Sequence, residues 1–369
     1  MGSSSEFIAL GTVNLTDRTL ELVTAAVKDG RIGQGPLISQ FEEELASWFG
    51  VRQAILVANG TIADAVALAA ATDGSDRQGE VILPALTFVA QANAVYYNHL
   101  THRFVDVTDD YQIDLEQVEA AISPHTVAIM PTHLLGRPAN MDGILELADK
   151  HGLPVVEDAC EALGSRYQNR LVGTLGNMGC FSFFVSHVIT TGEGGVIITD
   201  DLELAETARS LRNHGRLSDK PEEKFLFPRI GFSGKMNQLE AAVGLGVMPV
   251  LGEIIAKRRD NLLFLNKLLG GRFSEGPNEC IVPHGYPVEF PDLRARDHAI
   301  NYLYEKGIEC RRLFSSIPTQ VPAYAFLGHR LGEFPVAERI GDRGLYVPCH
   351  QNLSEVDLRR IAQALGELL

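Results

Sequence analysis

The sequence predicts an α/β protein in which a mostly parallel β-sheet carries helices on both faces, followed by a smaller C-terminal α+β domain. Between about residues 36 and 213, short apolar strands alternate with segments that repeat apolar residues at helical spacing. Such alternation is typical of parallel strands joined by crossover helices. After about residue 250 the chain becomes a long helical segment followed by short strands rich in proline. We therefore predict a large domain over residues 1–250 and a small domain over residues 251–369.

The elements follow in order from the periodicity of the apolar residues. The first predicted helix carries Leu37, Phe41, Leu45 and Trp48, which share one face at a period of about 3.6 residues. Ser354 precedes the last predicted helix as a suitable N-cap. Strands are predicted at residues 54–58, 81–83, 104–107, 127–130, 155–157, 180–184 and 195–199, and further helices from 61 and at 90–97, 115–122, 141–150, 202–212, 252–269 and 355–368.

Composition restricts the possible partners. The net charge is −15, and no block of lysine and arginine stands out, so we expect neither nucleic acid nor an anionic membrane as a partner. No apolar run reaches the length of about 18 residues that a membrane span needs. The five cysteines form no CxxC pair, so neither a metal site nor a disulfide framework is expected, and a reducing cytoplasm fits. Residues 1–5 are expected to be a flexible terminus or a remnant of cloning.

A candidate anion site follows the first strand of the predicted sheet. Asn59-Gly60-Thr61 stands directly after that strand and opens a helix. Glycine allows close approach of the backbone, and the free N–H groups of a helix N-terminus attract a phosphate. Ser182, on a later strand, is placed to reach the same phosphate. Taken alone, a simple helix cap is the commoner explanation of such a turn.

Two further positions suggest a cofactor site. Asp158 ends a buried strand, where a carboxylate is costly unless it meets a cation, and a protonated pyridine nitrogen is such a partner. A carboxylate that caps a loop explains Asp158 equally well by itself. His187 lies in the turn of the stretch FSFFVSHVITTGEGG, residues 181–195. A lone histidine is more often a solvated or core residue than a functional one.

Taken together, these motifs resemble the DegT/DnrJ/EryC1/StrS sugar aminotransferases, which have the type I fold of pyridoxal-phosphate enzymes, as in aspartate aminotransferase. The resemblance covers about 340 residues in ordered motifs, so it is far more specific than any one of them. The segments that carry it are GRIGQGPLISQFEEELASWFG (30–50), NGTIADAVAL (59–68), EVILPALTFVAQANAV (80–95), PTHLLGRP (131–138), VVEDACEALGS (155–165), LRNHG (211–215) and GLYVPCHQNLSEVDL (344–358).

The resemblance implies a role for each candidate residue toward pyridoxal 5′-phosphate or its amine form, pyridoxamine 5′-phosphate. Gly60, Thr61 and Ser182 would hold the phosphate. Phe88 would stack on the pyridine ring, and Asp158 would pair with the ring nitrogen. Glu161 would lie near the 3-oxygen of the ring, at a position where the family often has Gln or Asp.

One departure from the family pattern concerns the expected homodimer. The family usually shows Gly-Tyr-Asn-x-Arg, whose Asn reaches the phosphate of the neighbouring subunit. Here the stretch from Gly231 to Lys235 reads GFSGK, so Ser233, with a shorter reach, takes the place of that Asn. Arg212, Arg216, Arg229 and His214 are further candidates to contact a sugar or a diphosphate, although solvated surface is the commoner role of such residues.

The second departure is His187, which stands where the aminotransferases have the lysine that binds the cofactor covalently. An imidazole cannot make that bond, but it can move protons near neutral pH, because its ordinary pKa is about 6.5. The 3-dehydratases of nucleotide-linked 4-keto-6-deoxy sugars share this replacement. Residues 187–232 contain no cysteine, so the version with an iron–sulfur cluster is excluded. The remaining kind resembles the cluster-free GDP-4-keto-6-deoxymannose 3-dehydratase of deoxysugar and O-antigen biosynthesis.

The resemblance therefore implies an enzyme that removes the C3 hydroxyl of a nucleotide-linked 4-keto-6-deoxyhexose, with L-glutamate as the amine donor. His187 is expected to act first as a base and then as an acid. Two alternatives remain open. One is an aminotransferase of the same family whose lysine was lost in nature or replaced deliberately. The other is a non-catalytic protein that binds the cofactor or a sugar nucleotide.

Overall fold

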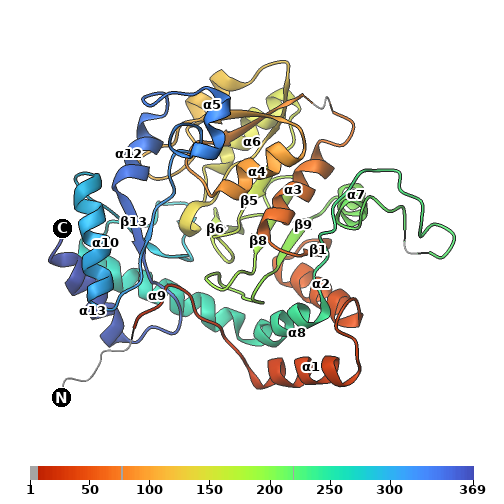
Figure 1. The fold of residues 1–369 in the computed structure, drawn as a ribbon, viewed down its shortest axis with the longest axis horizontal. Helices are drawn as coiled ribbons and strands as arrows, with labels where there is room; N and C mark the ends of the chain where they lie inside the picture. Colours follow the sequence, from red (N-terminus) through yellow and green to blue (C-terminus); the bar gives the residue numbers. More distant parts are fainter. Residues whose placement is uncertain (1–6, 76–77, 219) are drawn as a thin grey trace.

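The central feature of the fold is a mixed sheet built from the strands of the first two hundred residues (Figure 1). The computed structural model describes residues 7–75, 78–218 and 220–369, so the terminus expected at residues 1–5 lies outside the described residues. The strands of this sheet are β1 (Gln53–Val57), β2 (Glu80–Pro84), β3 (Thr101–Val105), β4 (Thr126–Ile129), β5 (Val156–Asp158), β8 (Met178–Ser182) and β9 (Gly195–Thr199).

The strands pair in two groups that short bridges join. One group has the order β1-β9-β8-β5 and the other β3-β2-β4, and bridges from Ile129 to Val155 and from Thr132 to Asp158 link β4 to β5. All pairs are parallel except those of β9, which runs antiparallel to both β1 and β8. The predicted mostly parallel sheet is therefore confirmed, and β1, β5 and β8 end at the same edge.

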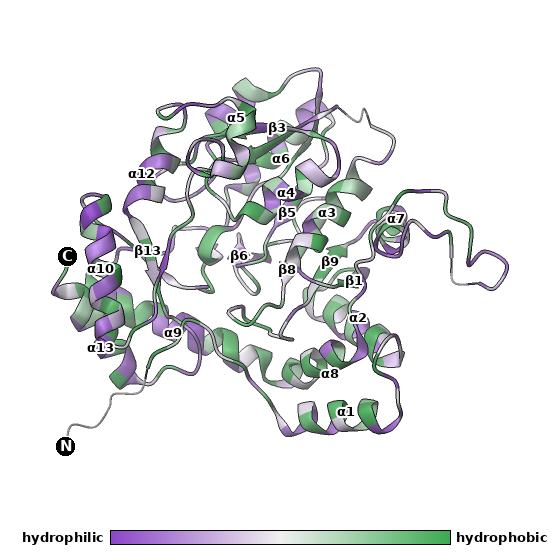
Figure 2. Ribbon diagram, viewed as in Figure 1, coloured by the Kyte–Doolittle hydropathy of each residue, from purple (hydrophilic) through white to green (hydrophobic). Residues whose placement is uncertain are grey.

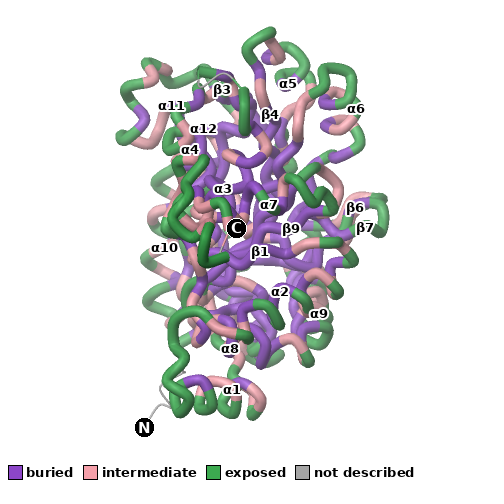
Figure 3. The backbone as a smooth tube through the Cα atoms, turned by 90° about the vertical axis from the view of Figure 1, so that its right-hand side faces the viewer, coloured by how far each residue is buried: buried purple, intermediate pink, exposed green. Residues whose placement is uncertain are grey.

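Helices cover both faces of the sheet, as predicted. Along β1, Ile55 and Val57 belong to one buried cluster with α3 (Gly60–Ala71), α4 (Val89–Tyr97) and α7 (Leu202–Arg212). Their neighbours Ala54 and Leu56 belong to a second cluster on the other face. There the sheet meets α2 (Pro36–Phe49), α5 (Leu115–Ala121), α6 (Met141–His151) and α8 (Gln238–Val247). Hydrophobic residues gather on strands such as β9 (Figure 2), and the strands form the buried interior in Figure 3.

The C-terminal part packs against the α3 face. The buried cluster that contains Ile55 continues into residues such as Tyr286 and Leu345. Residue 250 ends a 3₁₀ turn between α8 and α9 (Leu251–Leu269), and the division into two domains there stays a prediction. The remaining elements are α1 (Asp17–Lys28), η1 (Leu134–Gly136), β6 (Arg166–Tyr167), β7 (Arg170–Leu171), η2 (Met248–Val250), β10 (Glu279–Cys280), β11 (Tyr286–Glu289), α10 (Leu293–Glu305), β12 (Arg311–Arg312), α11 (Ile317–Gln320), η3 (Pro322–Leu327), α12 (Pro335–Arg343), β13 (Gly344–Val347) and α13 (Glu355–Gly366).

One helical run deserves comparison with a membrane span. Among the described residues, Gln238–Leu269 is long and apolar enough to cross a bilayer by length and composition, and 44% of its most apolar window is buried inside the protein. Its first part, α8, packs against α1 and α2. A core helix of a folded domain passes the same test of length and composition.

Buried hydrogen bonds fix the strand that carries Asp158. The preceding residue, Glu157, is completely buried, and His133 Nε2 lies 2.9 Å from its Oε2. Its two carboxylate oxygens also accept the backbone N–H groups of Gly173, Leu175 and Gly176 at 2.7, 2.7 and 2.6 Å. These bonds satisfy a charge that would otherwise be costly inside the protein, and they hold the 173–176 turn against β5.

We expect Glu157→Gln to lower the free energy of unfolding by about 3 kcal/mol, because its amide group would turn an N–H toward backbone donors that need an acceptor. Urea denaturation followed by circular dichroism measures the change. Glu206→Gln, at an exposed position on α7, is the matched control and should change stability by less than about 0.5 kcal/mol. Equal effects of the two substitutions would contradict this role of Glu157.

Candidate functional site

The predicted site residues meet at the edge where β1, β5 and β8 end. They line a cavity of about 310 Å³. Seven of the eight predicted residues are part of its wall: Gly60, Thr61, Phe88, Asp158, Glu161, Ser182 and His187. Ser233 is exposed and is absent from that wall. The structure thus brings together residues that lie more than one hundred positions apart.

The N-terminus of α3 forms part of the cavity wall. The Asn59 side chain caps the helix by accepting the N–H of Ile62 at 3.0 Å. A Cβ atom on Gly60 would lie only 2.8 Å from the Ser182 Cβ and 2.9 Å from the Cys160 Sγ, so a larger residue there would force these groups apart. Free N–H groups at the helix start and the hydroxyls of Thr61 and Ser182 suit a phosphate.

Asp158 lies deeper in the cavity and is buried. Its Oδ1 accepts the backbone N–H of Cys160 at 3.1 Å. Burial raises the pKa of the Asp158 carboxyl, since desolvation disfavours its charged form. A protonated ring nitrogen beside it would offset that cost, so Asp158 fits the partner that the family resemblance implies.

Aromatic and acidic side chains form the walls beside Asp158. The Phe88 ring is 54% exposed and packs against Phe314 at 5.5 Å between ring centroids, with the two ring planes tilted by 52°. This leaves ring surface for a stacked ligand. Glu161 accepts the N–H of Leu135 at 2.8 Å. Burial raises the pKa of Glu161 to about 8, so this carboxyl carries a proton at neutral pH.

His187 occupies the turn after β8, and its backbone carbonyl accepts a hydrogen bond from Arg258 Nη2 at 3.0 Å. Its ring lies 4.8 Å from that of His284, and its Nδ1 is buried without a hydrogen-bond partner. The expected near-neutral pKa is wrong for this structure. Burial, followed by the charges of Arg258 and Arg311, lowers the pKa of His187 to about 3. The imidazole is therefore neutral at neutral pH and has a free nitrogen.

The donor set fits pyridoxal or pyridoxamine phosphate. The cavity offers a helix N-terminus for the phosphate, an aromatic face for the ring and a buried carboxyl for the ring nitrogen. Among the described residues that line it, none is a lysine. Covalent attachment of an aldehyde through a cavity lysine is therefore not available to this chain.

Sequence reasoning missed several residues of this wall. The most notable are Asp64, His284, Arg311 and Tyr346. Asp64 had a signal, because it follows Gly60 by four residues and so lies on the same face of α3. The other three belong to the C-terminal part of the chain, and nothing in the sequence pattern places them beside β8.

The basic residues considered as sugar or diphosphate contacts lie elsewhere. Arg212 Nη1 binds Glu42 Oε1 at 2.7 Å and the carbonyl of Leu56 at 2.5 Å. Arg229 Nε binds Asp73 Oδ2 at 2.9 Å. None of Arg212, Arg216, Arg229 and His214 is among the described residues that line the cavity.

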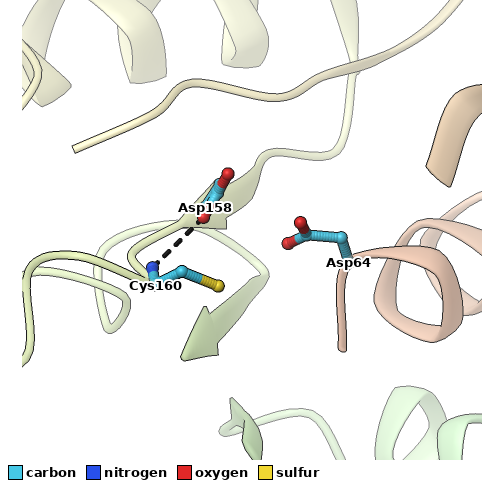
Figure 4. Close-up of side chains that lie close together, drawn as sticks. All are labelled: Asp64, Asp158 and Cys160. Atoms are coloured by element: carbon cyan, nitrogen blue, oxygen red, sulfur yellow. Dashed lines mark hydrogen bonds between the residues drawn. The ribbon is translucent and has the colours of Figure 1, made fainter. Parts of the chain in front are cut away.

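Three ionisable side chains come close together in the cavity wall. Ligand-type atoms of Asp64, Asp158 and Cys160 lie within 4.8 Å of one another. The three side chains come from α3 and from the end of β5, and they converge in the interior (Figure 4).

Comparison with known proteins agrees with this geometry. The model of the DegT/DnrJ/EryC1/StrS aminotransferase family matches residues 14–366. The chain belongs to this family. A GDP-perosamine synthase of Caulobacter vibrioides is 38% identical over 91% of each chain. A dTDP-4-dehydro-2,6-dideoxy-D-glucose 3-dehydratase of Saccharopolyspora spinosa is 31% identical, over 97% of this chain and 86% of that protein.

Solved structures of the family share the fold. Helicobacter pylori PseC, an aminotransferase involved in the biosynthesis of pseudoaminic acid, superposes with a TM-score of 0.89 at 26% identity and covers 99% of both chains. DesV of S. venezuelae gives a TM-score of 0.90 at 29% identity over 98% of both chains. The predicted family and the predicted type I fold are both confirmed.

The depressed pKa of His187 predicts a dependence of stability on pH. The unfolded chain binds a proton at this histidine below about pH 6.5, whereas the folded protein does so only near pH 3. The free energy of unfolding is therefore unaffected by this histidine above pH 6.5, and it falls progressively as the pH is lowered from 6.5 toward 3, because the unfolded chain takes up a proton that the folded protein does not. Asn does not titrate, so between pH 6 and pH 5 we expect the free energy of unfolding of His187→Asn to fall by about 1 kcal/mol less than that of the wild type. Urea denaturation of both proteins at pH 7, 6 and 5 measures this, and identical slopes would contradict it.

Proposed function

We propose that this chain is a 3-dehydratase that removes the C3 hydroxyl of a nucleotide-linked 4-keto-6-deoxyhexose in deoxysugar biosynthesis, with pyridoxamine 5′-phosphate as its cofactor. The observation that carries the proposal is His187. It puts an imidazole in the cavity wall beside Ser182 and Asp158, and no lysine is among the described lining residues. Relatives of 38% and 31% identity are a GDP-perosamine synthase and a 3-dehydratase, so membership of the family does not by itself choose between the reactions.

The cofactor would be held by non-covalent contacts alone. Gly60, Thr61 and Ser182 bind its phosphate, Phe88 stacks on its ring, and Asp158 keeps its ring nitrogen protonated. When bound, it supplies an amine for the C4 ketone of the sugar and a ring system that accepts electrons from the reacting carbons.

The protein's part in the chemistry is proton transfer by two groups with opposed pKa shifts. His187 is neutral in this cavity, because its pKa is lowered to about 3, and a base of that pKa holds a proton weakly. We propose that the negative charges of the bound cofactor and substrate raise this pKa toward neutrality, so that the ring nitrogen accepts a proton. Glu161 keeps its proton, because its pKa is raised to about 8, so its carboxyl oxygen can supply one to the departing C3 hydroxyl. Neighbouring groups whose pKa values move apart are a common basis for assigning the acid and the base of a reaction. This assignment replaces one in which the same imidazole performs both tasks.

The overall reaction needs an amine donor, for which we propose L-glutamate. Over a complete cycle, glutamate and the 4-keto-6-deoxy sugar give 2-oxoglutarate, ammonia and the 3-deoxy-4-keto sugar. Oxidation of the glutamate Cα provides the electron pair that replaces the C3–O bond by a C3–H bond. The C3 oxygen leaves as one water molecule, and one water molecule is consumed when carbon–nitrogen bonds are hydrolysed to release the products. The overall reaction therefore neither consumes nor releases water.

A homodimer is part of the proposal. The segment that joins α7 to α8 extends away from the rest of the molecule (Figure 1). It exposes Phe225, Leu226, Phe227 and Ile230, which favours a partner surface over them. Ser233 belongs to the same segment, so a second subunit is needed if its hydroxyl is to reach a phosphate. We propose a cytoplasmic location, where sugar nucleotides are available.

The second candidate function is an aminotransferase that works without the lysine. The relative named GDP-perosamine synthase, at 38% identity, favours it. In that case the product would be a sugar with an amino group at C4, and its C3 hydroxyl would be kept. A non-catalytic protein that binds the cofactor or a sugar nucleotide is the third.

The product of the reaction decides among these candidates. We expect purified protein with pyridoxamine phosphate, glutamate and a GDP- or dTDP-linked 4-keto-6-deoxyhexose to yield a sugar that lacks the C3 oxygen, together with ammonia. Mass spectrometry of the nucleotide sugar and an ammonia assay measure both. A 4-amino sugar without release of ammonia would instead establish the aminotransferase, and an unchanged substrate would leave only binding.

His187→Lys tests the residue on which the proposal rests. An amine at this position can bind the aldehyde form of the cofactor covalently, so we expect the cofactor to stay attached through gel filtration. Loss of the specific base should slow C3 removal by at least about a hundredfold. The control is His298→Lys, which adds a lysine at an exposed position of α10 and should change neither property. Unaltered dehydration by the His187→Lys protein would overturn the role of His187.

A further inference from the structure

A second carboxyl lies beneath the proposed partner of the ring nitrogen. Asp64 is on α3, four residues after Gly60, and only 1% of it is exposed. Its surroundings on the helix are Ala63, Ala65 and Val66. A carboxyl in such a setting is costly unless it is neutral or well partnered. Its presence therefore requires an explanation other than helix formation.

The partners of Asp64 do not compensate a charge. Its Oδ1 is buried without a hydrogen-bond partner, although the residue lines the cavity. The Cys180 thiol is its hydrogen-bonding neighbour. Figure 4 shows the Asp64 carboxyl turned toward Asp158 and Cys160, and the ligand-type atoms of the three residues lie within 4.8 Å of one another.

Two carboxylates this close cannot both be ionised cheaply inside a protein. Burial, and then the charge of Asp158, raises the pKa of Asp64 well above its ordinary value. The direction of that shift agrees with the geometry, since the groups beside Asp64, Asp158 and the Cys180 thiol, carry no positive charge. The closeness of the two carboxyls and the unpartnered Oδ1 of Asp64 therefore favour one retained proton on the pair, with Asp64 as the member less able to carry a charge.

We propose that Asp64 is a positioning residue for the cofactor's ring nitrogen. It forms with Asp158 a buried acid–carboxylate pair that retains one proton and presents a single negative charge to that nitrogen. The inference rests on the proposed function, because it needs a pyridine ring in the cavity. It adds a residue that acts through Asp158 and lies behind it.

The pair makes the affinity for the cofactor depend on pH in a way that a packing role does not. At pH values below the pKa of Asp64, the wild type and Asp64→Asn both present one negative charge to a protonated ring nitrogen. At pH values above the pKa of Asp64, the wild type presents a second negative charge and the Asn variant does not. Asn keeps the size of Asp64, so a purely structural effect would change the dissociation constant by the same factor at every pH.

The test is a fluorescence titration of the protein with pyridoxamine 5′-phosphate from pH 6 to pH 9. This form carries an amine, so it cannot react with surface lysines as the aldehyde does. We expect the ratio of dissociation constants, Asp64→Asn over wild type, to rise by about tenfold across this range, which corresponds to about one pKa unit of interaction. The ratio cancels the ligand's own ionisations. Asp260→Asn, at an exposed position of α9, should give a constant ratio.

A constant ratio for Asp64→Asn together with the absence of a protonated-carboxyl band at neutral pH would overturn the proposal while leaving the proposed function intact. A constant ratio with that band present means that the pair keeps its proton up to pH 9, which supports the proposal. Absence of binding by the wild type at every pH would overturn the cofactor and, with it, the role of Asp64. The proton itself is measured without cofactor by infrared spectroscopy in the Glu161→Gln background, which removes the other protonated carboxyl of the cavity. A protonated-carboxyl band at neutral pH that disappears when Asp64 is also replaced by Asn or Leu is expected, and its absence from the parent protein would contradict the inference.

Discussion

The position of His187 depends on one buried guanidinium. Arg258, on α9, is completely buried, and its Nε binds Gln351 Oε1 at 2.8 Å. Its Nη1 binds the carbonyl of Pro283 at 3.0 Å, and its Nη2 binds the carbonyl of His187 at 3.0 Å. A buried cation is tolerated only when its donors are satisfied in good geometry. The same requirement therefore ties the turn after β8 to the C-terminal part, and the cation helps keep the His187 ring neutral.

The adjacent carboxyls of Glu157 and Asp158 on β5 lie on opposite faces of the sheet and have different surroundings. Successive side chains of a strand point to opposite faces. Glu157 points away from the cavity and receives a full set of donors, three of them backbone N–H groups. Asp158 points into it and receives the N–H of Cys160. The first carboxylate is thus satisfied by the fold, whereas the second keeps capacity for a cation.

Much of the fold is predictable because one physical pattern repeats. The strands and helices from α2 to α7 carry apolar residues at regular spacing, and both faces of the sheet bury them. The cavity residues on the ends of β1, β5 and β8 follow from the rule that parallel strands end at one edge. Such reasoning has no access to partners brought in by tertiary packing. Arg258 and Arg311 are far from His187 in sequence, and after burial their charges lower its pKa.

Tertiary packing also changes the chemistry that a residue type suggests. An imidazole considered alone has a pKa suited to both giving and taking protons. In this cavity, burial and two nearby guanidinium groups favour the neutral form of His187, while burial and the charge of Asp158 favour the neutral form of Glu161. The same low-polarity environment thus keeps both side chains neutral although their ionised forms carry opposite charges, which neither residue type indicates by itself.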